Sequence, residues 1–341
     1  MMWVAAGVAF VVSLGSLFLL RPLLRHWGVL DVPNERSSHN SPVLRGAGLA
    51  PLLGIAIAYL IVLASHPSSI SLGLTWTALG GSVACGVLGW VEDFAGLRVA
   101  VRASLQLLIG VLSTSAIVMI EGVSPWWIPL GAIAVAGYIN VANFMDGING
   151  ISGLHAVVAG VTYAVLGVAL QEPWLITGGV VIAAAFGGFL PWNLLRGRVF
   201  LGDVGSYLLG GGIAVLAVGA FVNGAPLLAV LGPIAIYLAD SGLTLFRRIV
   251  NGERWYEAHR SHAYQRLTDY GLSHLSAASV VTISSAITAV VGLLAVGAPA
   301  NVVVLLTIAL LAVVTLYFGL VVLFKRRHGA LANSEAKGLA G

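Results

Sequence analysis

Charge is scarce in this sequence. Only 9% of its 341 residues are Asp, Glu, Lys or Arg, whereas 59% are hydrophobic. Soluble domains carry about 25% charged residues, so a soluble globular protein is excluded. Cysteine is nearly absent, and the single Cys85 stands inside an apolar run. This excludes a disulfide framework and a cysteine-based zinc cluster, and we interpret Cys85 as a small buried hydrophobic residue.

The amino-terminal twenty residues, MMWVAAGVAFVVSLGSLFLL, contain no charge at all. They lack the basic start and the small-residue cleavage site of a secretory signal, so they predict a retained membrane span. The other long apolar stretches also predict membrane spans, because a helix needs about twenty apolar residues to cross a bilayer. The predicted spans lie near 2–20, 47–65, 71–90, 101–120, 126–143, 153–170, 174–194, 205–222, 227–246, 276–297 and 301–324.

The predicted fold class is therefore all-α, a polytopic integral membrane protein with about eleven transmembrane helices. Residues 1–325 form one polytopic domain, and residues 326–341 form a C-terminal tail. The last ten residues, ANSEAKGLAG, are small and polar, and we expect them to lack regular structure.

Basic residues are missing from every second turn of this arrangement. All seventeen fall on one side: Arg21, Arg25, Arg36, Arg45, Arg98, Arg102, Arg196, Arg198, Arg247, Arg248, Arg254, Arg260, Arg266, Lys325, Arg326, Arg327 and Lys337. The positive-inside rule makes that side cytoplasmic, with the N-terminus outside and the C-terminus inside. Basic loops at an anionic leaflet also explain the net charge of +4 without a nucleic-acid partner.

Most acidic residues share this cytoplasmic side, where five loops each carry a polar motif. The motifs are DVPNERSSHNSPVLRGAG (31–48), WVEDFAGL (90–97), NVANFMDGINGISG (140–153), RVFLGDVGSYLLG (198–210) and RRIVNGERWYEAHRSHAYQRL (247–267). Carboxylates beside Gly and Asn suit Mg²⁺, which shares its coordination with substrate phosphates. Arg and His suit phosphate oxygens. The loops together predict an active site on the cytoplasmic face.

Each motif alone has a simpler interpretation. Asp146 could form a turn, Asp203 could cap a helix, and the remaining charges could be solvated or anchor the membrane. A transporter without chemistry is a second possibility, but its carboxylates would lie near the bilayer midplane. A non-catalytic assembly factor would tolerate loss of the acids. Asp240, seven residues before Arg247 on one helical face, is expected to support the site from a helix end.

The order of the motifs resembles the polyprenyl-phosphate N-acetylhexosamine-1-phosphate transferase family over residues 15–325. NFMDGINGISG and FLGDVGS are the most specific stretches. PNERSSHNSPVLRGAG and HRSHAYQRL look most like the branch that starts O-antigen or related glycans. The alternative, a phospho-MurNAc-pentapeptide translocase, carries a run of histidines in the fifth loop that this chain does not have.

The resemblance implies transfer of N-acetylhexosamine 1-phosphate from a UDP-sugar to undecaprenyl phosphate, giving a lipid-pyrophosphate sugar and UMP. It implies Mg²⁺ as cofactor, with Mn²⁺ as a substitute, a bacterial inner-membrane location and a homodimer. The implied site residues are the catalytic acids Glu92, Asp93, Asp146 and Asp203; the metal ligands Asn143 and Asp203; and the substrate-binding residues Asn140, Asn149, Phe200, Arg36, His39, Arg45, His259, Arg260 and His262. The family usually has two aspartates where this chain has Glu92–Asp93.

The chemistry itself favours direct displacement. A lipid monophosphate has a second pKa near 6, so at neutral pH it is mostly a dianion and a competent nucleophile. Bringing it against a pyrophosphate requires charge neutralisation more than a base. We therefore expect Asp93 to organise the surroundings of the lipid phosphate. A covalent aspartyl-phosphate is the alternative.

Overall fold

The computed structural model describes residues 1–31, 42–65, 71–194, 199–254 and 260–338. Its helices are α1 (Met2–His26), α2 (Leu49–Ala64), α3 (Leu72–Ala95), α4 (Val99–Glu121), α5 (Trp127–Phe144), α6 (Ile151–Leu170), α7 (Pro173–Leu194), α8 (Gly202–Val222), α9 (Leu227–Leu231), η1 (Gly232–Ile234), α10 (Ala235–Val250), α11 (Ala263–Asp269), α12 (His274–Leu293) and α13 (Ala300–Gly338). Two short antiparallel strands, β1 (Leu30–Asp31) and β2 (Val43–Leu44), pair beside them.

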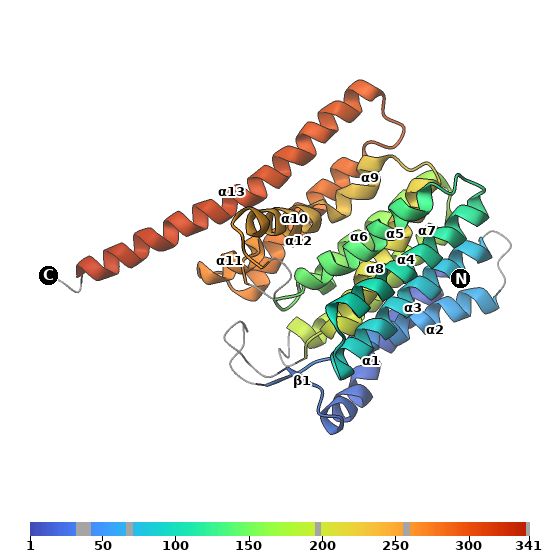
Figure 1. The fold of residues 1–341 in the computed structure, drawn as a ribbon, viewed down its shortest axis with the longest axis horizontal. Helices are drawn as coiled ribbons and strands as arrows, with labels where there is room; N and C mark the ends of the chain where they lie inside the picture. Colours follow the sequence, from blue (N-terminus) through green and yellow to red (C-terminus); the bar gives the residue numbers. More distant parts are fainter. Residues whose placement is uncertain (32–41, 66–70, 195–198, 255–259, 339–341) are drawn as a thin grey trace.

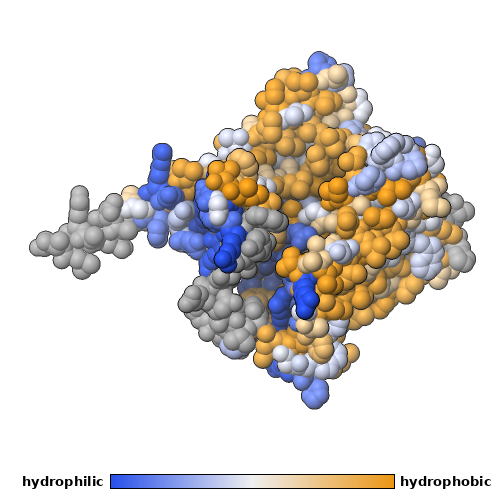
Figure 2. Space-filling model, in the orientation of Figure 1, coloured by the Kyte–Doolittle hydropathy of each residue, from blue (hydrophilic) through white to orange (hydrophobic). Residues whose placement is uncertain are grey.

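The all-α polytopic fold class is confirmed. Within the described residues, ten helical segments are long and apolar enough to cross a membrane, and α2 is a shorter apolar helix of 16 residues. Hydrocarbon cannot hydrogen-bond to a peptide group, and the helix satisfies every such group internally. Apolar side chains accordingly cover the bundle, whereas hydrophilic ones gather beside the ends of α10 and α11 (Figure 2).

One local expectation is wrong. The helix α13 continues to Gly338, so the polar tail is helical over most of the stretch that was expected to lack regular structure. Ala, Leu, Glu and Lys are good helix formers. Extending an existing helix also avoids the cost of nucleating a new one.

Helix α8 forms the centre of the bundle. Buried residues make up 89% of its spanning window, against 11% for α13, which leans away from the other helices (Figure 1). Association between helices in lipid depends on close packing, which small residues permit. Gly89 of α3 shows this directly, because a Cβ there would overlap the backbone carbonyl of Asp203 at the start of α8. The expected burial of Cys85 within this core is confirmed.

The ninth predicted span is broken. It runs from Leu227 to Val250 as α9, the 3₁₀ turn η1 and α10, with Pro233 inside the turn. Proline removes a backbone donor and clashes with the preceding turn, so a straight helix cannot continue through it. The broken span lies across from α5, and the two line a common cavity.

Candidate active site

Two aspartates and one arginine form an ion cluster at the start of α8. Arg45 Nε lies 2.6 Å from Asp93 Oδ1, and Arg45 Nη2 lies 2.8 Å from Asp203 Oδ2. The Asp93 side chain is completely buried and also accepts the backbone N–H groups of Asp203 and Val204, at 3.0 and 2.9 Å. Negative charge at a helix N-terminus is favourable. Asp93 of α3 therefore anchors α8 while sharing Arg45 with Asp203.

The helix-cap interpretation of Asp203 is wrong. Asp203 lies in the first turn of α8, and its side chain caps no backbone group there. Its Oδ1 instead accepts from Asn143 Nδ2 at 2.7 Å, and its Oδ2 accepts from Arg45. The glycine before it is required, because Gly202 has φ +74° and a Cβ there would lie 2.5 Å from Asp93 Oδ2. The LGDVGS motif thus builds the contact between α3 and α8.

Asp146 stands in the turn between α5 and α6. Its Oδ1 accepts the Ser152 hydroxyl at 2.6 Å, and its half-buried side chain lines the cavity. The pKa of Asp146 is raised to about 7, chiefly by burial; the charges of Asp203 and Asp93 act in the same direction, and the Ser152 hydrogen bond and Arg45 act against them. A turn residue in water would keep an ordinary pKa. The turn interpretation is therefore insufficient, and a nearby cation would stabilise the ionised form.

These side chains suit a hard cation. Among the described residues, no group of three or more His, Cys, Asp or Glu side chains is arranged to hold a metal ion by itself. A Mg²⁺ site does not need such a group, because the ion commonly takes one or two carboxylates and completes its coordination with phosphate oxygens and water. Asp203 and Asn143 are in direct contact and Asp146 lies on the neighbouring turn, so three oxygen donors of the right type are close together.

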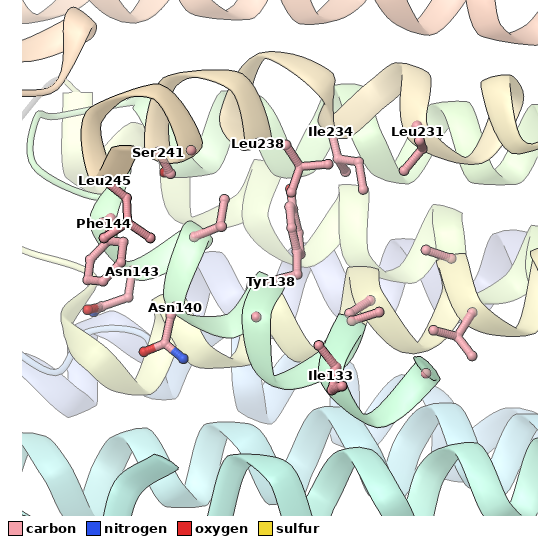
Figure 3. Close-up of a pocket in the computed structure, with 18 of the residues that line it drawn as sticks. Ile133, Tyr138, Asn140, Asn143, Phe144, Leu231, Ile234, Leu238, Ser241 and Leu245 are labelled. Atoms are coloured by element: carbon pink, nitrogen blue, oxygen red, sulfur yellow. The ribbon is translucent and has the colours of Figure 1, made fainter. Parts of the chain in front are cut away.

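A cavity of about 1190 Å³ opens beside this cluster, between α4, α5, α8, the broken span and α11. One end is polar and is lined by Arg102, Asn140, Asn143, Asp146 and His262. From there the cavity follows α5 past Tyr138 and Ile133, with Leu238, Ile234 and Leu231 on the opposite wall (Figure 3). The far end reaches Trp127 and Leu227, at the other ends of the spans. A polar head and a long apolar chain would both find matching walls.

Other expected site residues lie outside the cavity wall. Arg260 forms a half-exposed ion pair with Asp269 at 2.9 Å. The backbone of Phe200 bonds to Leu44, and the backbone N–H of Asn149 reaches His274 Nδ1 at 3.5 Å. Arg36, His39 and His259 fall outside the described residues.

Glu92 and Asp93, although adjacent, serve different partners. Glu92 Oε1 lies 3.1 Å from Arg102 Nη1, and Glu92 Oε2 accepts the backbone N–H of Leu97 at 2.9 Å. Glu92 thus braces the turn between α3 and α4 and holds Arg102, and it does not join Asp203. Arg102 is the one Lys or Arg among the described residues that line the cavity. Sequence analysis counted Arg102 only among the basic residues that set the membrane orientation, and no local pattern marks it as a cavity residue. It lies one turn before Gln106, which accepts a hydrogen bond from Asn140.

Replacement of Arg102 by alanine is expected to raise the KM for a phosphate-bearing substrate on the order of 10- to 100-fold, because the charge-assisted hydrogen bond that Arg102 would donate to a phosphate in the cavity is removed. Steady-state kinetics with each substrate varied in turn would measure this. Glu92→Ala should act in the same direction but more weakly, since it only releases Arg102. Arg98→Ala is the matched control, because Arg98 is exposed at the start of the same helix. Equal effects of the Arg98 and Arg102 changes would assign only a surface-charge role to Arg102.

Fold and site together define a polytopic membrane protein with a long cavity. Its polar end is lined by Arg102, Asp146 and His262 and lies beside the ion cluster at the start of α8. Residues 75–220 match the model of glycosyl transferase family 4. A phospho-N-acetylmuramoyl-pentapeptide-transferase of Desulforudis audaxviator is 31% identical over 255 residues, covering 63% of this chain and 75% of the relative. The chain belongs to the polyprenyl-phosphate N-acetylhexosamine-1-phosphate transferases of this family.

Two further relatives carry related names. A probable undecaprenyl-phosphate N-acetylglucosaminyl 1-phosphate transferase of Bacillus subtilis is 27% identical over 293 residues, 80% of each chain. An undecaprenyl-phosphate alpha-N-acetylglucosaminyl 1-phosphate transferase of Yersinia pestis is 26% identical over 311 residues, covering 84% of this chain and 82% of the relative. The expected family resemblance is confirmed.

Proposed function

We propose that this protein transfers N-acetylhexosamine 1-phosphate from a UDP-sugar to undecaprenyl phosphate in a Mg²⁺-dependent reaction. The observation that carries the proposal is the cavity with one polar and one apolar end. A polyprenyl phosphate needs both, because its chain belongs in the membrane and its phosphate belongs at the interface. A soluble nucleotide sugar needs only the polar end. The two substrates would therefore meet beside Asn143 and Asp146.

The acceptor phosphate is placed at Arg102, with Asn140 beside it. Its apolar chain would follow α5 between Tyr138 and Leu238 toward Leu231 (Figure 3). Burying this chain against apolar walls matches its environment in the bilayer, so affinity would depend mainly on the phosphate. The alternative of a transporter requires a path for a polar substrate, and the apolar length of this cavity does not support one.

The donor pyrophosphate is placed at Asp203, Asn143 and Asp146, which would hold Mg²⁺. The bound ion would neutralise phosphate charge and align the reacting groups. Asn143 and Asp203 are already in contact, so their positions are set before substrate arrives. His262 contributes a polar side chain to the same end of the cavity. Asn149 and Phe200 keep their expected roles toward the nucleotide, and Arg260 and His259 keep theirs toward the sugar or its phosphates. Arg36 and His39 stay predicted substrate-binding residues.

Asp93 is assigned a supporting part. Both of its oxygens are engaged by Arg45 and by the start of α8, and the side chain has no exposed surface. Attack by this carboxylate on a phosphorus atom would break those contacts and expose the N-terminus of α8. The dianionic lipid phosphate needs no such intermediate. These contacts support a single displacement, in which the lipid phosphate attacks the sugar-bearing phosphorus and UMP leaves.

The site is proposed to face the cytoplasm of a bacterial inner membrane, with the N-terminus outside and the C-terminus inside. The distribution of all seventeen basic residues supports this orientation. The product would start O-antigen or a related cell-envelope glycan. The expected homodimer stays a prediction, which sedimentation of the detergent-solubilised protein would check.

A panel of UDP-sugars tests the function. Purified protein with undecaprenyl phosphate and Mg²⁺ should release UMP from at least one of them, and UDP-N-acetylglucosamine comes first because relatives are named for N-acetylglucosamine. Undecaprenol is the matched control acceptor, since it has the chain but no phosphate, and it should give no UMP. EDTA should stop the reaction. Failure with every sugar, or release that ignores the lipid, would contradict the proposal.

A further inference from the structure

Asp240 is a buried acid that the reaction above does not use. It lies on α10 and its residue surface is 0% exposed. A buried carboxylate is costly unless hydrogen bonds replace its water. The contacts that do so come from Thr244 Oγ1 at 3.4 Å, His262 Nδ1 at 3.3 Å, the backbone N–H groups of Ala263 and Tyr264 at 2.9 and 3.2 Å, and the Tyr317 hydroxyl at 2.7 Å.

These donors come from three separate elements. Thr244 belongs to α10 itself, Tyr317 belongs to α13, and the other three residues form the start of α11. A carboxylate that accepts two backbone N–H groups can also accept from an imidazole only if the imidazole nitrogen carries the hydrogen. The contact therefore favours the His262 form that is protonated at Nδ1. Such a partner fixes both the tautomer and the ring orientation of a histidine.

The start of α11 in turn holds the donor-side wall of the cavity. The His262 ring stacks on Phe144, with centroids 6.2 Å apart, and the Tyr264 hydroxyl donates to the Phe144 backbone carbonyl at 3.0 Å. Tyr264 also packs tightly against Gly147, where a Cβ would overlap its hydroxyl. Phe144 and Gly147 bracket Asp146, and Phe144 follows Asn143. The position of α11 therefore constrains the side chains of Asn143 and Asp146.

We infer that Asp240 is a positioning residue for the nucleotide-sugar side of the site. It holds His262 in one tautomer and presses Tyr264 against the turn that carries Asn143 and Asp146. This inference rests on the proposed function for its kinetic consequence, but the contacts themselves do not. Within the described residues, neither Arg102 nor Asn140, on the lipid side, forms a hydrogen bond or ion pair with Asp240 or the start of α11. The effect of Asp240 should therefore be confined to the donor.

The test is Asp240→Asn, which keeps the volume and removes the charge. The KM for the UDP-sugar should rise by roughly tenfold, the size expected for losing charge-assisted hydrogen bonds, while the KM for undecaprenyl phosphate stays unchanged. Loss of folded protein alone would lower the apparent kcat and leave both KM values unchanged. Asp240→Glu should recover part of the loss, since it restores the carboxylate.

Two comparisons separate positioning from simple stability. Tyr317→Phe removes one donor to Asp240 but keeps every donor that α11 supplies, so it should lower thermal stability and leave the donor KM unchanged. In protein that already carries His262→Ala, Asp240→Asn should raise the KM for the UDP-sugar by a smaller factor than it does in the wild-type protein. The reason is that Asp240 and His262 act through one contact. Fully additive effects, or an unchanged donor KM in Asp240→Asn, would overturn the inference.

A readout without turnover distinguishes this inference from the proposed function. Hydrogen exchange of the peptide that contains Ala263 and Tyr264 should accelerate in Asp240→Asn and keep its wild-type rate in Tyr317→Phe. If the wild-type protein releases no UMP from any sugar but exchange behaves in this way, the function fails and the anchoring role stands. If exchange is identical in wild-type and Asp240→Asn protein, the anchoring role is refuted whatever the activity.

Discussion

Replacement of Asp203 by asparagine is expected to lower UMP release on the order of 100- to 1,000-fold, comparable to loss of one preorganised group that stabilises transition-state charge. Asparagine matches aspartate in size but removes a negative charge that Asn143 and Arg45 both contact. With that charge absent, the proposed Mg²⁺ site would lose a carboxylate ligand, and Arg45 would retain Asp93 alone. Initial rates across a range of Mg²⁺ concentrations measure the loss.

Glu253→Gln is the matched control for this change. Glu253 is also a carboxylate after a helix end on the basic side of the protein, where it pairs with Arg248 at 2.9 Å and is 46% exposed. Its replacement should leave the rate unchanged. Size-exclusion profiles and melting temperatures in detergent should show that the Asp203 variant is folded. Near-normal turnover in a folded Asp203→Asn protein would remove this residue from the metal site.

Much of the fold could be predicted from sequence because lipid imposes a simple rule. Each apolar run of about twenty residues had to become helical, and every predicted span coincides with one helix except the ninth, which is divided into α9, η1 and α10. The break at Pro233 could not have been predicted from proline alone, because Pro22 and Pro191 lie inside the continuous helices α1 and α7. The helical tail was missed because polarity alone was considered, and the end of a long existing helix favours continuation.

The site was harder to predict because neighbours in sequence diverge in space. Successive residues on a helix point about 100° apart, so Glu92 turns to Arg102 while Asp93 turns to α8. Which face of α4 meets the cavity depends on packing against α5, and no local pattern specifies it. The partners of Asp240 lie up to 77 residues away along the chain. Motif order could therefore identify the loops, but only packing separates the residues that line the cavity from those that support it.

The reaction should run backwards, and its lipid requirement should reveal the mechanism. One phosphoanhydride is exchanged for another, so the free-energy change should be small, and a difference of about 1.4 kcal/mol would shift the equilibrium only tenfold. Radiolabelled UMP supplied in excess should therefore enter UDP-sugar. A single displacement requires the lipid-pyrophosphate sugar for this exchange. A two-step reaction through a phosphorylated aspartate would exchange UMP with UDP-sugar in delipidated protein.

The structure favours the lipid-dependent result by a wide margin. Asp93 would have to leave Arg45 and two backbone N–H groups before it could attack phosphorus, and each charge-assisted contact contributes about 1.5–3 kcal/mol. We expect no exchange above background without lipid, and exchange that returns when undecaprenyl phosphate is added with the UDP-sugar. Protein carrying Asp93→Asn should show the same lipid requirement at a lower rate. Exchange by delipidated wild-type protein that disappears in the Asp93 variant would instead establish Asp93 as the nucleophile, and α8 would then have to lose its anchor in every catalytic cycle.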